Sequence, residues 1–153
     1  MSRQPARWMK NLLDAPETNV AIFSFLLNLV WEVAQIPLFS GMARAEHGNA
    51  LLVCTRATIG DVAIAEIAFC VMALRVGSRR WILRASPAMM TGFVAVGVVI
   101  TIILEYLATH VFGRWTYAPT MPVVPVLRVG LTPLLQWIIL PPIVVWFTRR
   151  QLT

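Results

Sequence analysis

Apolar residues gather in four long stretches along the chain, and shorter polar stretches separate them. The apolar stretches cover residues 20–39, 50–76, 88–112 and 131–147. A helix needs roughly 20 apolar residues to cross the hydrocarbon layer of a membrane, which is about 30 Å thick. Each stretch meets or nearly meets that length, so the pattern predicts an all-α fold, a membrane bundle of four transmembrane helices. We expect residues 1–153 to form a single integral membrane domain.

The composition supports a membrane location. Of 153 residues, 58% are hydrophobic and 13% are charged, and the mean hydropathy is +0.72, which lies outside the usual balance of a soluble domain. The first 19 residues are too polar for the apolar region of a signal peptide, so we expect the first span to stay in the mature protein. Cys54 and Cys70 lie about four turns apart on one predicted helix, too far apart to form a disulfide with each other.

The basic residues predict the orientation. Nine of the thirteen fall on one side of the predicted bundle: Arg3, Arg7, Lys10, Arg75, Arg79, Arg80, Arg84, Arg149 and Arg150. Because positive charge accumulates in cytoplasmic loops, both termini are expected to be cytoplasmic and the protein to lie in the inner membrane. The pI near 10.7 then reflects topology and contact with anionic lipid, so we expect no nucleic-acid partner.

Acidic residues inside the spans are the most informative feature. With alternating helix directions, Glu32, Asp61 and Glu105 come to a similar depth in the outer half of the membrane, and Asn28 and Gln35 lie on the same helix face as Glu32. Such groups are costly in lipid and are expected to face the bundle interior.

Two interpretations of these acids stay open. They either pair with Arg56, Arg128, Asn28 and Gln136 and hold the bundle together, or they form a functional site. Four acids, with Glu66 included, face two nearby arginines, so we expect at least one acid to be protonated or to serve a ligand.

The segment "GRWTYAPTMPVVPVLRVGLTP" follows the third span. It is too rich in proline for a regular helix and too apolar for a solvated loop, so we expect an irregular lid over the outer end of the bundle. The alternative is an irregular loop with interfacial aromatic residues, Trp115 and Tyr117. Pro141 and Pro142 predict a last helix that is kinked or opened, and Gln136 on that helix lies at the level of the acids.

Six residues around this segment carry a resemblance to a known family: Glu105, Gly113, Trp115, Tyr117, Gly130 and Pro133. Over about a fifth of the chain this pattern resembles the small polytopic membrane proteins of the lycopene cyclase domain type. That resemblance implies a membrane enzyme acting on a carotenoid or isoprenoid lipid. In that family an acidic pair after the proline is associated with proton-driven cyclisation, whereas this chain has "PLLQ" there. The chain also resembles short bacterial four-helix membrane proteins of unassigned function with "WEVAQ" and "GD" motifs.

Three functions remain as hypotheses. The first is a membrane enzyme that acts on a long apolar lipid of the isoprenoid or carotenoid type by general-acid chemistry. Its expected catalytic residues are Glu105, Asp61 and Glu32, and its expected substrate-binding residues are Arg56, Arg128, Trp115, Tyr117, Gln136, Asn28 and Gln35. The second is a proton-linked carrier or channel, and the third is an accessory subunit of a larger complex.

No cofactor is expected from the sequence. His47, Cys54 and His110 could approach Glu105 as a metal site, but no pair of them has the spacing of metal ligands. A homodimer or a larger membrane assembly is compatible with all three hypotheses.

Overall fold

The computed structural model describes residues 13–153, and the predicted basic residues Arg3, Arg7 and Lys10 lie outside the described residues. Four helices make up most of the structure: α2 (Pro16–Gln35), α3 (His47–Val76), α4 (Pro87–Tyr106) and α5 (Leu131–Leu152). All four are long and apolar enough to cross a membrane. The predicted all-α bundle of four spans is confirmed, and α5 continues five residues beyond the predicted span. Arg149 and Arg150 lie in its last turn, where positive charge stabilises a helix end.

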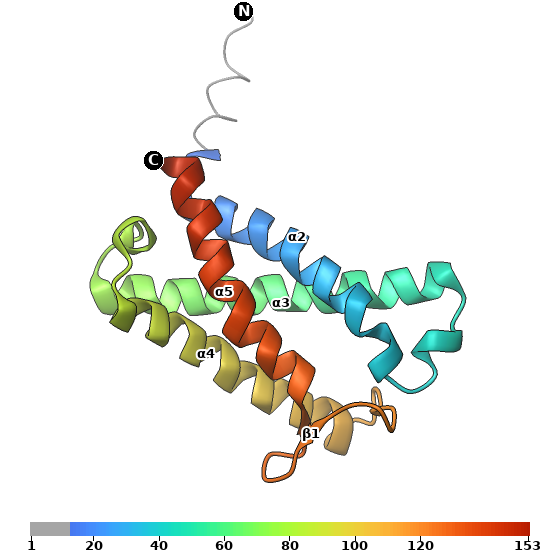
Figure 1. Cartoon of the computed structure of the whole chain (residues 1–153). Helices are drawn as coiled ribbons and strands as arrows, with labels where there is room; N and C mark the ends of the chain where they lie inside the picture. Colours follow the sequence, from blue (N-terminus) through green and yellow to red (C-terminus); the bar gives the residue numbers. More distant parts are fainter. Residues whose placement is uncertain (1–12) are drawn as a thin grey trace, which may run out of the picture.

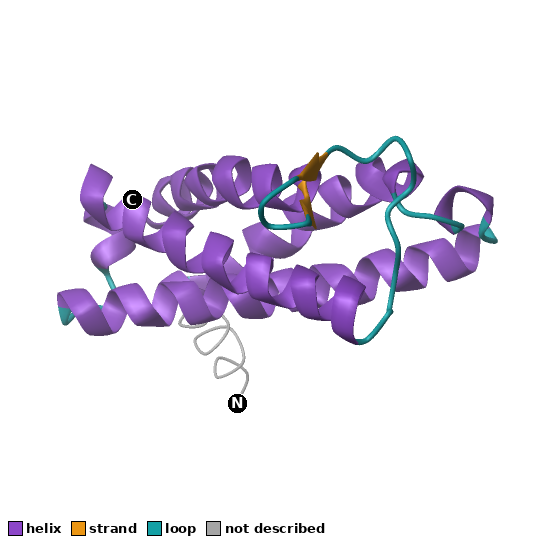
Figure 2. Cartoon of the chain, turned by 90° about the horizontal axis from the view of Figure 1, so that it is seen from below, coloured by secondary structure: helices purple, strands orange, loops and turns teal. Residues whose placement is uncertain are grey.

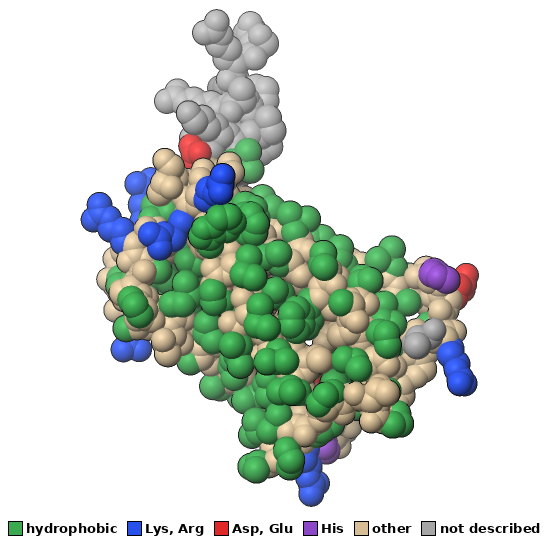
Figure 3. Space-filling model, viewed as in Figure 1, with side chains coloured by type: hydrophobic (Ala, Val, Ile, Leu, Met, Phe, Trp, Pro, Cys, Tyr) green, Lys and Arg blue, Asp and Glu red, His purple; other side chains and the backbone are tan. Residues whose placement is uncertain are grey.

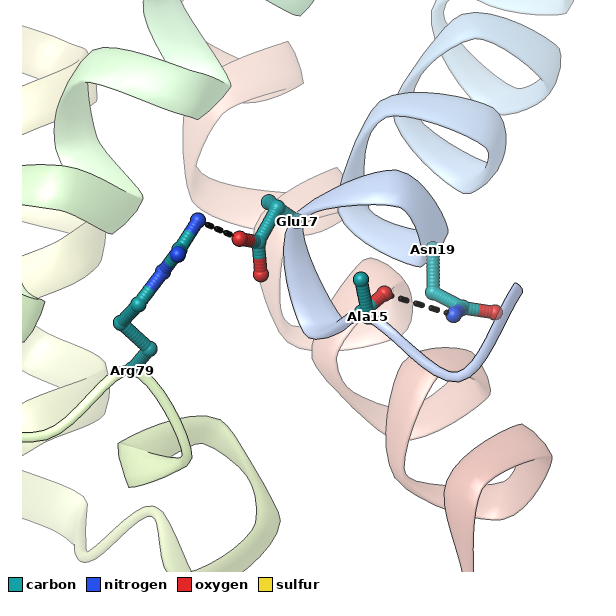
Figure 4. A network of polar contacts seen from close by, with 4 residues as sticks. All are labelled: Ala15, Glu17, Asn19 and Arg79. Atoms are coloured by element: carbon teal, nitrogen blue, oxygen red, sulfur yellow. Dashed lines mark hydrogen bonds and ion pairs between the residues drawn. The ribbon is translucent and has the colours of Figure 1, made fainter. Parts of the chain in front are cut away.

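Successive helices run in opposite directions between the two ends of the bundle (Figure 1). One end holds the start of α2, the link at residues 77–86 and the end of α5, and we call it the basic end. Figure 3 shows that Lys and Arg side chains gather there. An ion pair between Arg79 and Glu17 joins the link to the first turn of α2, beside the hydrogen bond from Asn19 to Ala15 (Figure 4).

The largest apolar core lies in the half of the bundle near the basic end. Trp81, in the short helix Trp81–Arg84, contacts Phe69 of α3 and Phe93 of α4, with ring centroids 5.8 and 5.6 Å away. Its indole N–H donates to the Phe69 carbonyl at 3.3 Å. Aromatic pairs in this tilted geometry add to the energy of burial alone. This core joins the link to both helices that it connects.

Gly97 of α4 lies against the Trp137 ring of α5. A Cβ atom built at Gly97 would come within 2.0 Å of the Trp137 ring, a distance that no side chain could occupy. Glycine therefore lets α4 and α5 approach closely, as small residues do between membrane helices.

The prolines of α5 do not open the helix. It continues in α-helical conformation through Pro141 and Pro142 to Leu152, so of the two expected alternatives, a kinked or an opened helix, the opened one is wrong. Each proline removes one backbone donor, and Pro141 is buried inside the bundle, where packing holds the helix together.

The opposite end of the bundle is covered by two connecting segments, residues 36–46 and residues 112–130, and we call it the cap end. The cap segment, residues 112–130, leaves α4 through a π-helical turn at Leu107–Val111. Its backbone then pairs with the α2–α3 connection, because Ser40 donates to the Thr116 carbonyl and Ala118 donates to the Leu38 carbonyl, both at 2.9 Å.

A hairpin of two short strands, β1 (Val123–Val124) and β2 (Val129–Gly130), completes the cap segment and leads into α5. Figure 2, which views the molecule from below Figure 1, shows the strands and the loops around them crossing over the helices. The predicted cover over the bundle is therefore an ordered segment that is hydrogen-bonded to the chain beneath it.

Candidate functional site

Gln136 is at the centre of a group of polar side chains near the cap end. Its side-chain nitrogen lies 2.7 Å from Asn28 Oδ1, 3.3 Å from Glu32 Oε1 and 3.1 Å from Asp61 Oδ2. Gln35, one turn beyond Glu32, donates to Glu32 Oε1 at 2.7 Å. We call these five residues the Gln136 network, and they join α2, α3 and α5.

The network contains more hydrogen-bond acceptors than donors. A glutamine amide has two N–H hydrogens, yet the Gln136 nitrogen faces three oxygen atoms. Asn28 uses a hydrogen of its own amide to bond the Ser24 carbonyl at 2.8 Å. Gln35 Oε1 is buried and has no partner in the described structure. The protein's own N–H groups therefore leave part of this network unsatisfied.

Glu105 lies at the end of α4, beside the network. The Tyr117 hydroxyl of the cap segment donates to Glu105 Oε2, and the Trp115 indole lies next to the same carboxyl group. Glu105 belongs to α4, which packs against both α3 and α5. Of the three acids that the sequence placed at one depth, Glu32 and Asp61 share Gln136 as a partner, and Glu105 pairs with the cap segment.

Tyr117 is suited to act as a donor at all ordinary pH values. Burial raises the pKa of its hydroxyl well above the usual value, and the adjacent Glu105 raises that pKa further. Gly130 lies beneath the Tyr117 ring, where a Cβ atom would come within 3.2 Å of the ring edge. The start of α5 and the end of α4 therefore hold this phenol in place together.

The structure does not bring Arg56 and Arg128 to the network. Both side chains are exposed. Arg56 lies on the outward face of α3, and Arg128 occupies the hairpin turn with a positive φ of 55°. Within residues 13–153 the single ion pair is the one between Arg79 and Glu17. The expected pairing of the acids with these two arginines is therefore not seen, and their hydrogen-bond partners are neutral side chains.

The residues considered for a metal site are also separated. His47 is exposed at the start of α3, and His110 stacks on Tyr106 with ring centroids 4.8 Å apart. Cys54 is buried, and its sulfur lies 3.7 Å from the Glu32 carbonyl oxygen. In the described part of the chain, no three His, Cys, Asp or Glu side chains come together in a way that could hold a metal ion.

Two further residues of the site, Ser24 and Trp137, were not identified from the sequence. Ser24 and Trp137 join Asn28 and Gln136 in lining a cavity of about 10 Å³, which has room for about one water molecule. The Trp137 indole N–H lies near Asp61 without meeting the geometry of a hydrogen bond, and Thr101 Oγ1, one turn from Glu105, has no partner either. Ser24 could have been found, because it precedes Asn28 by four residues on the same face of α2.

Glu66 lies outside the network. It lies in the half of α3 nearer the basic end, and its buried Oε1 atom has no partner among the described residues.

Comparisons of the chain with protein-family models, with curated proteins and with solved structures find no match.

Proposed function

We propose that this multi-pass membrane protein binds a long apolar lipid at the cap end and donates a proton to it from the Gln136 network or from Glu105. The observation that carries the proposal is that Glu32 and Asp61 share one glutamine and Glu105 pairs with a tyrosine, so the hydrogen-bond partners of these acids are neutral. Uncompensated carboxylates are costly to bury, and the network lacks donors. A proton held by one carboxyl group removes a charge and supplies a missing donor, and such a group is a general acid.

Glu105 is the proposed proton donor. It lies at the end of α4 under the cap segment, where Tyr117 and Trp115 provide aromatic surface next to the carboxyl group. In the proposed step the O–H bond of Glu105 breaks and its electron pair stays on the carboxylate, while the π electrons of a carbon–carbon double bond of the lipid form a new C–H bond to that hydrogen. The lipid becomes a carbocation, and it returns to a neutral product by losing a proton from a neighbouring carbon. Tyr117 then stabilises the carboxylate by its hydrogen bond. Asp61 and Glu32 are the neighbouring groups from which the proton is replaced.

The lipid is proposed to be of the isoprenoid or carotenoid type. Support comes from the sequence pattern around Glu105, Trp115, Tyr117 and Pro133 and from the apolar surface that surrounds the spans. A ligand of this kind reaches the site from the membrane, where it is dissolved.

A proton-linked carrier is the second candidate, and one observation favours it. The small cavity beside Gln136 is also lined by Ser24, which lies one helical turn nearer the basic end than Asn28. Beyond that point the interior is filled by the core around Trp81, Phe69 and Phe93. Because a carrier needs a polar route to both sides, this core favours the enzyme over the carrier.

The orientation is part of the proposal. We place both termini in the cytoplasm and the cap end outside the inner membrane, because basic side chains gather at the opposite end. In a background without the native cysteines, a cysteine at Thr120 should react with an impermeant thiol reagent in intact cells. A cysteine at Ser78 should be protected, and its labelling would reverse the orientation.

The function is tested by the lipids that the purified protein retains. Extracts of the protein should contain a long-chain isoprenoid lipid in excess over bulk phospholipid, and Trp115→Ala should reduce that excess. Glu105→Gln should leave the protein folded and abolish conversion of the lipid, whereas the control Glu66→Gln changes an acid outside the network. Extracts with phospholipid alone, together with a proton flux in liposomes that Glu105→Gln abolishes, would favour the carrier instead.

A further inference from the structure

The Gln136 network also restricts the chemistry of the ligand's polar end. The expectation from the sequence was that Arg56 or Arg128 would position that end, and arginine binds phosphate and carboxylate well. Both arginines are exposed and away from the network. The charged side chains near Gln136 are acids: Glu32 and Asp61 within hydrogen-bond distance, and Glu105 close by.

Buried polar atoms without partners point to what the ligand must supply. Gln35 is 6% exposed, and its amide is held by Glu32, so its free Oε1 acceptor belongs to the network. Trp137 is 3% exposed and has a free indole N–H near Asp61, and Thr101, 6% exposed, has a free hydroxyl one turn from Glu105. Buried polar atoms are rarely left unpaired. A hydroxyl group can donate to an acceptor such as Gln35 Oε1 or accept from a donor such as the Trp137 N–H.

We infer that the site takes a lipid whose head group donates hydrogen bonds and carries no negative charge, an alcohol or an amine, and that it rejects a lipid phosphate. This inference rests on the proposed function and names the class of its ligand. An alcohol or amine supplies the missing donor to the acceptors of the network. A phosphate adds acceptors and places negative charge beside Glu32, Asp61 and Glu105, and juxtaposed like charges disfavour binding strongly.

Three probes with the same fifteen-carbon isoprenoid chain test the inference: farnesol, farnesylamine and farnesyl phosphate. Binding is measured by equilibrium dialysis against the full-length protein in nanodiscs of neutral lipid, and empty nanodiscs report the partition into lipid alone. The alcohol and the amine should bind at least about tenfold more tightly than the phosphate, because a single uncompensated charge contact is worth that much.

Two variants connect the selectivity to the network. Asp61→Asn removes one charge and adds an amide donor, so it should weaken the amine and bring the affinity for the phosphate closer to that for the alcohol. The control Glu66→Gln removes a carboxylate from the same helix outside the network and should leave the selectivity unchanged. Glu32→Gln serves the same purpose as Asp61→Asn if that variant does not fold.

The outcomes separate this inference from the proposed function. If the phosphate binds as tightly as the alcohol and the amine, or more tightly, the inference about the head group is wrong while lipid binding stands. If no probe binds beyond the empty nanodiscs, lipid binding itself is wrong, and the inference falls with it. If the preference for alcohol and amine is present but unchanged in Asp61→Asn and in Glu32→Gln, the network does not cause it, and the inference is wrong.

Discussion

The interior of the bundle changes in character between its two ends. In the half near the basic end, Phe69, Trp81 and Phe93 pack against apolar neighbours. In the half near the cap end, the side chains between the helices include Asn28, Glu32, Asp61, Gln136 and Glu105. Hydrophobic packing has a clear role in holding helices together, whereas half-buried acids without cations make the folded protein harder to form. The comparison assigns stability to the first half, and the proposed site lies in the second.

The largest effect is expected from the apolar half. Trp81→Ala removes a ring that contacts two helices, and truncation of a buried tryptophan costs about 3–5 kcal/mol. The melting temperature in detergent should fall strongly, while lipid binding per folded molecule stays unchanged. The control Trp146→Ala removes a ring that is 52% exposed and should cost less than about 1 kcal/mol. Loss of binding by folded Trp81→Ala protein would break the division between the halves.

A smaller loss is expected where α4 and α5 touch. In Gly97→Ala the new methyl group would overlap the Trp137 ring, and overpacking of this kind costs about 1–3 kcal/mol. Because Trp137 adjoins Gln136, this variant should also weaken ligand binding. Gly60→Ala is the matched control, since nothing lies within 4 Å of the added methyl group, and thermal unfolding should show no loss. Equal melting temperatures for the two variants would show that α4 and α5 pack differently.

The sequence predicted which polar side chains of the spans come together better than it predicted the positions of Arg56 and Arg128. Helical periodicity brought Asn28, Glu32 and Gln35 to one face, and the alternating direction of the spans brought Asp61 and Gln136 to their depth. Depth alone does not say which way a side chain faces. Arg56 follows the buried Cys54 by two residues, a rotation of about 200° around the helix, so it points away from the bundle.

The path of the cap segment could not be predicted in the same way. Its backbone pairs with Leu38 and Ser40, which are more than 70 residues away in the sequence, and no local pattern encodes such a contact. The position of Arg128 follows from that path and from a turn in which its φ is positive. The continuity of α5 through two prolines depends on packing, which a local rule for proline does not include.

An intermediate effect is expected from the contact between the cap segment and Glu105. Tyr117→Phe removes the donor to that carboxyl group, and one hydrogen bond contributes about 0.5–1.5 kcal/mol. The raised pKa of Tyr117 means that the folded protein favours the protonated phenol. The stabilisation of the folded protein by the Tyr117 phenol is therefore complete below the ordinary pKa of 10.0. This stabilisation is lost as the pH rises through the higher pKa of the folded state.

The pH dependence provides the check on this prediction. Unfolding measured between pH 7 and pH 11 should show the difference between the wild type and Tyr117→Phe shrinking at the alkaline end. A difference that stays constant over this range would mean that the phenol contributes by packing alone.

The smallest effect is expected at the surface of the basic end. Arg79→Gln breaks the ion pair with Glu17, but the Arg79 side chain is 74% exposed, and exposed pairs contribute less than about 1 kcal/mol. The small loss of stability should disappear in high salt, because salt screens exposed charges. A loss that persists in high salt would indicate that the link is held by this pair rather than by the Trp81 core.

Infrared difference spectroscopy tests the central claim, that a carboxyl group near Gln136 carries a proton in the folded protein. At neutral pH the wild type should show the carbonyl stretching band of a protonated carboxylic acid. That band should be lost or shifted in at least one of Glu32→Gln, Asp61→Asn and Glu105→Gln, and should keep its position in Glu66→Gln. A spectrum without such a band, or a band that only Glu66→Gln removes, would contradict the account.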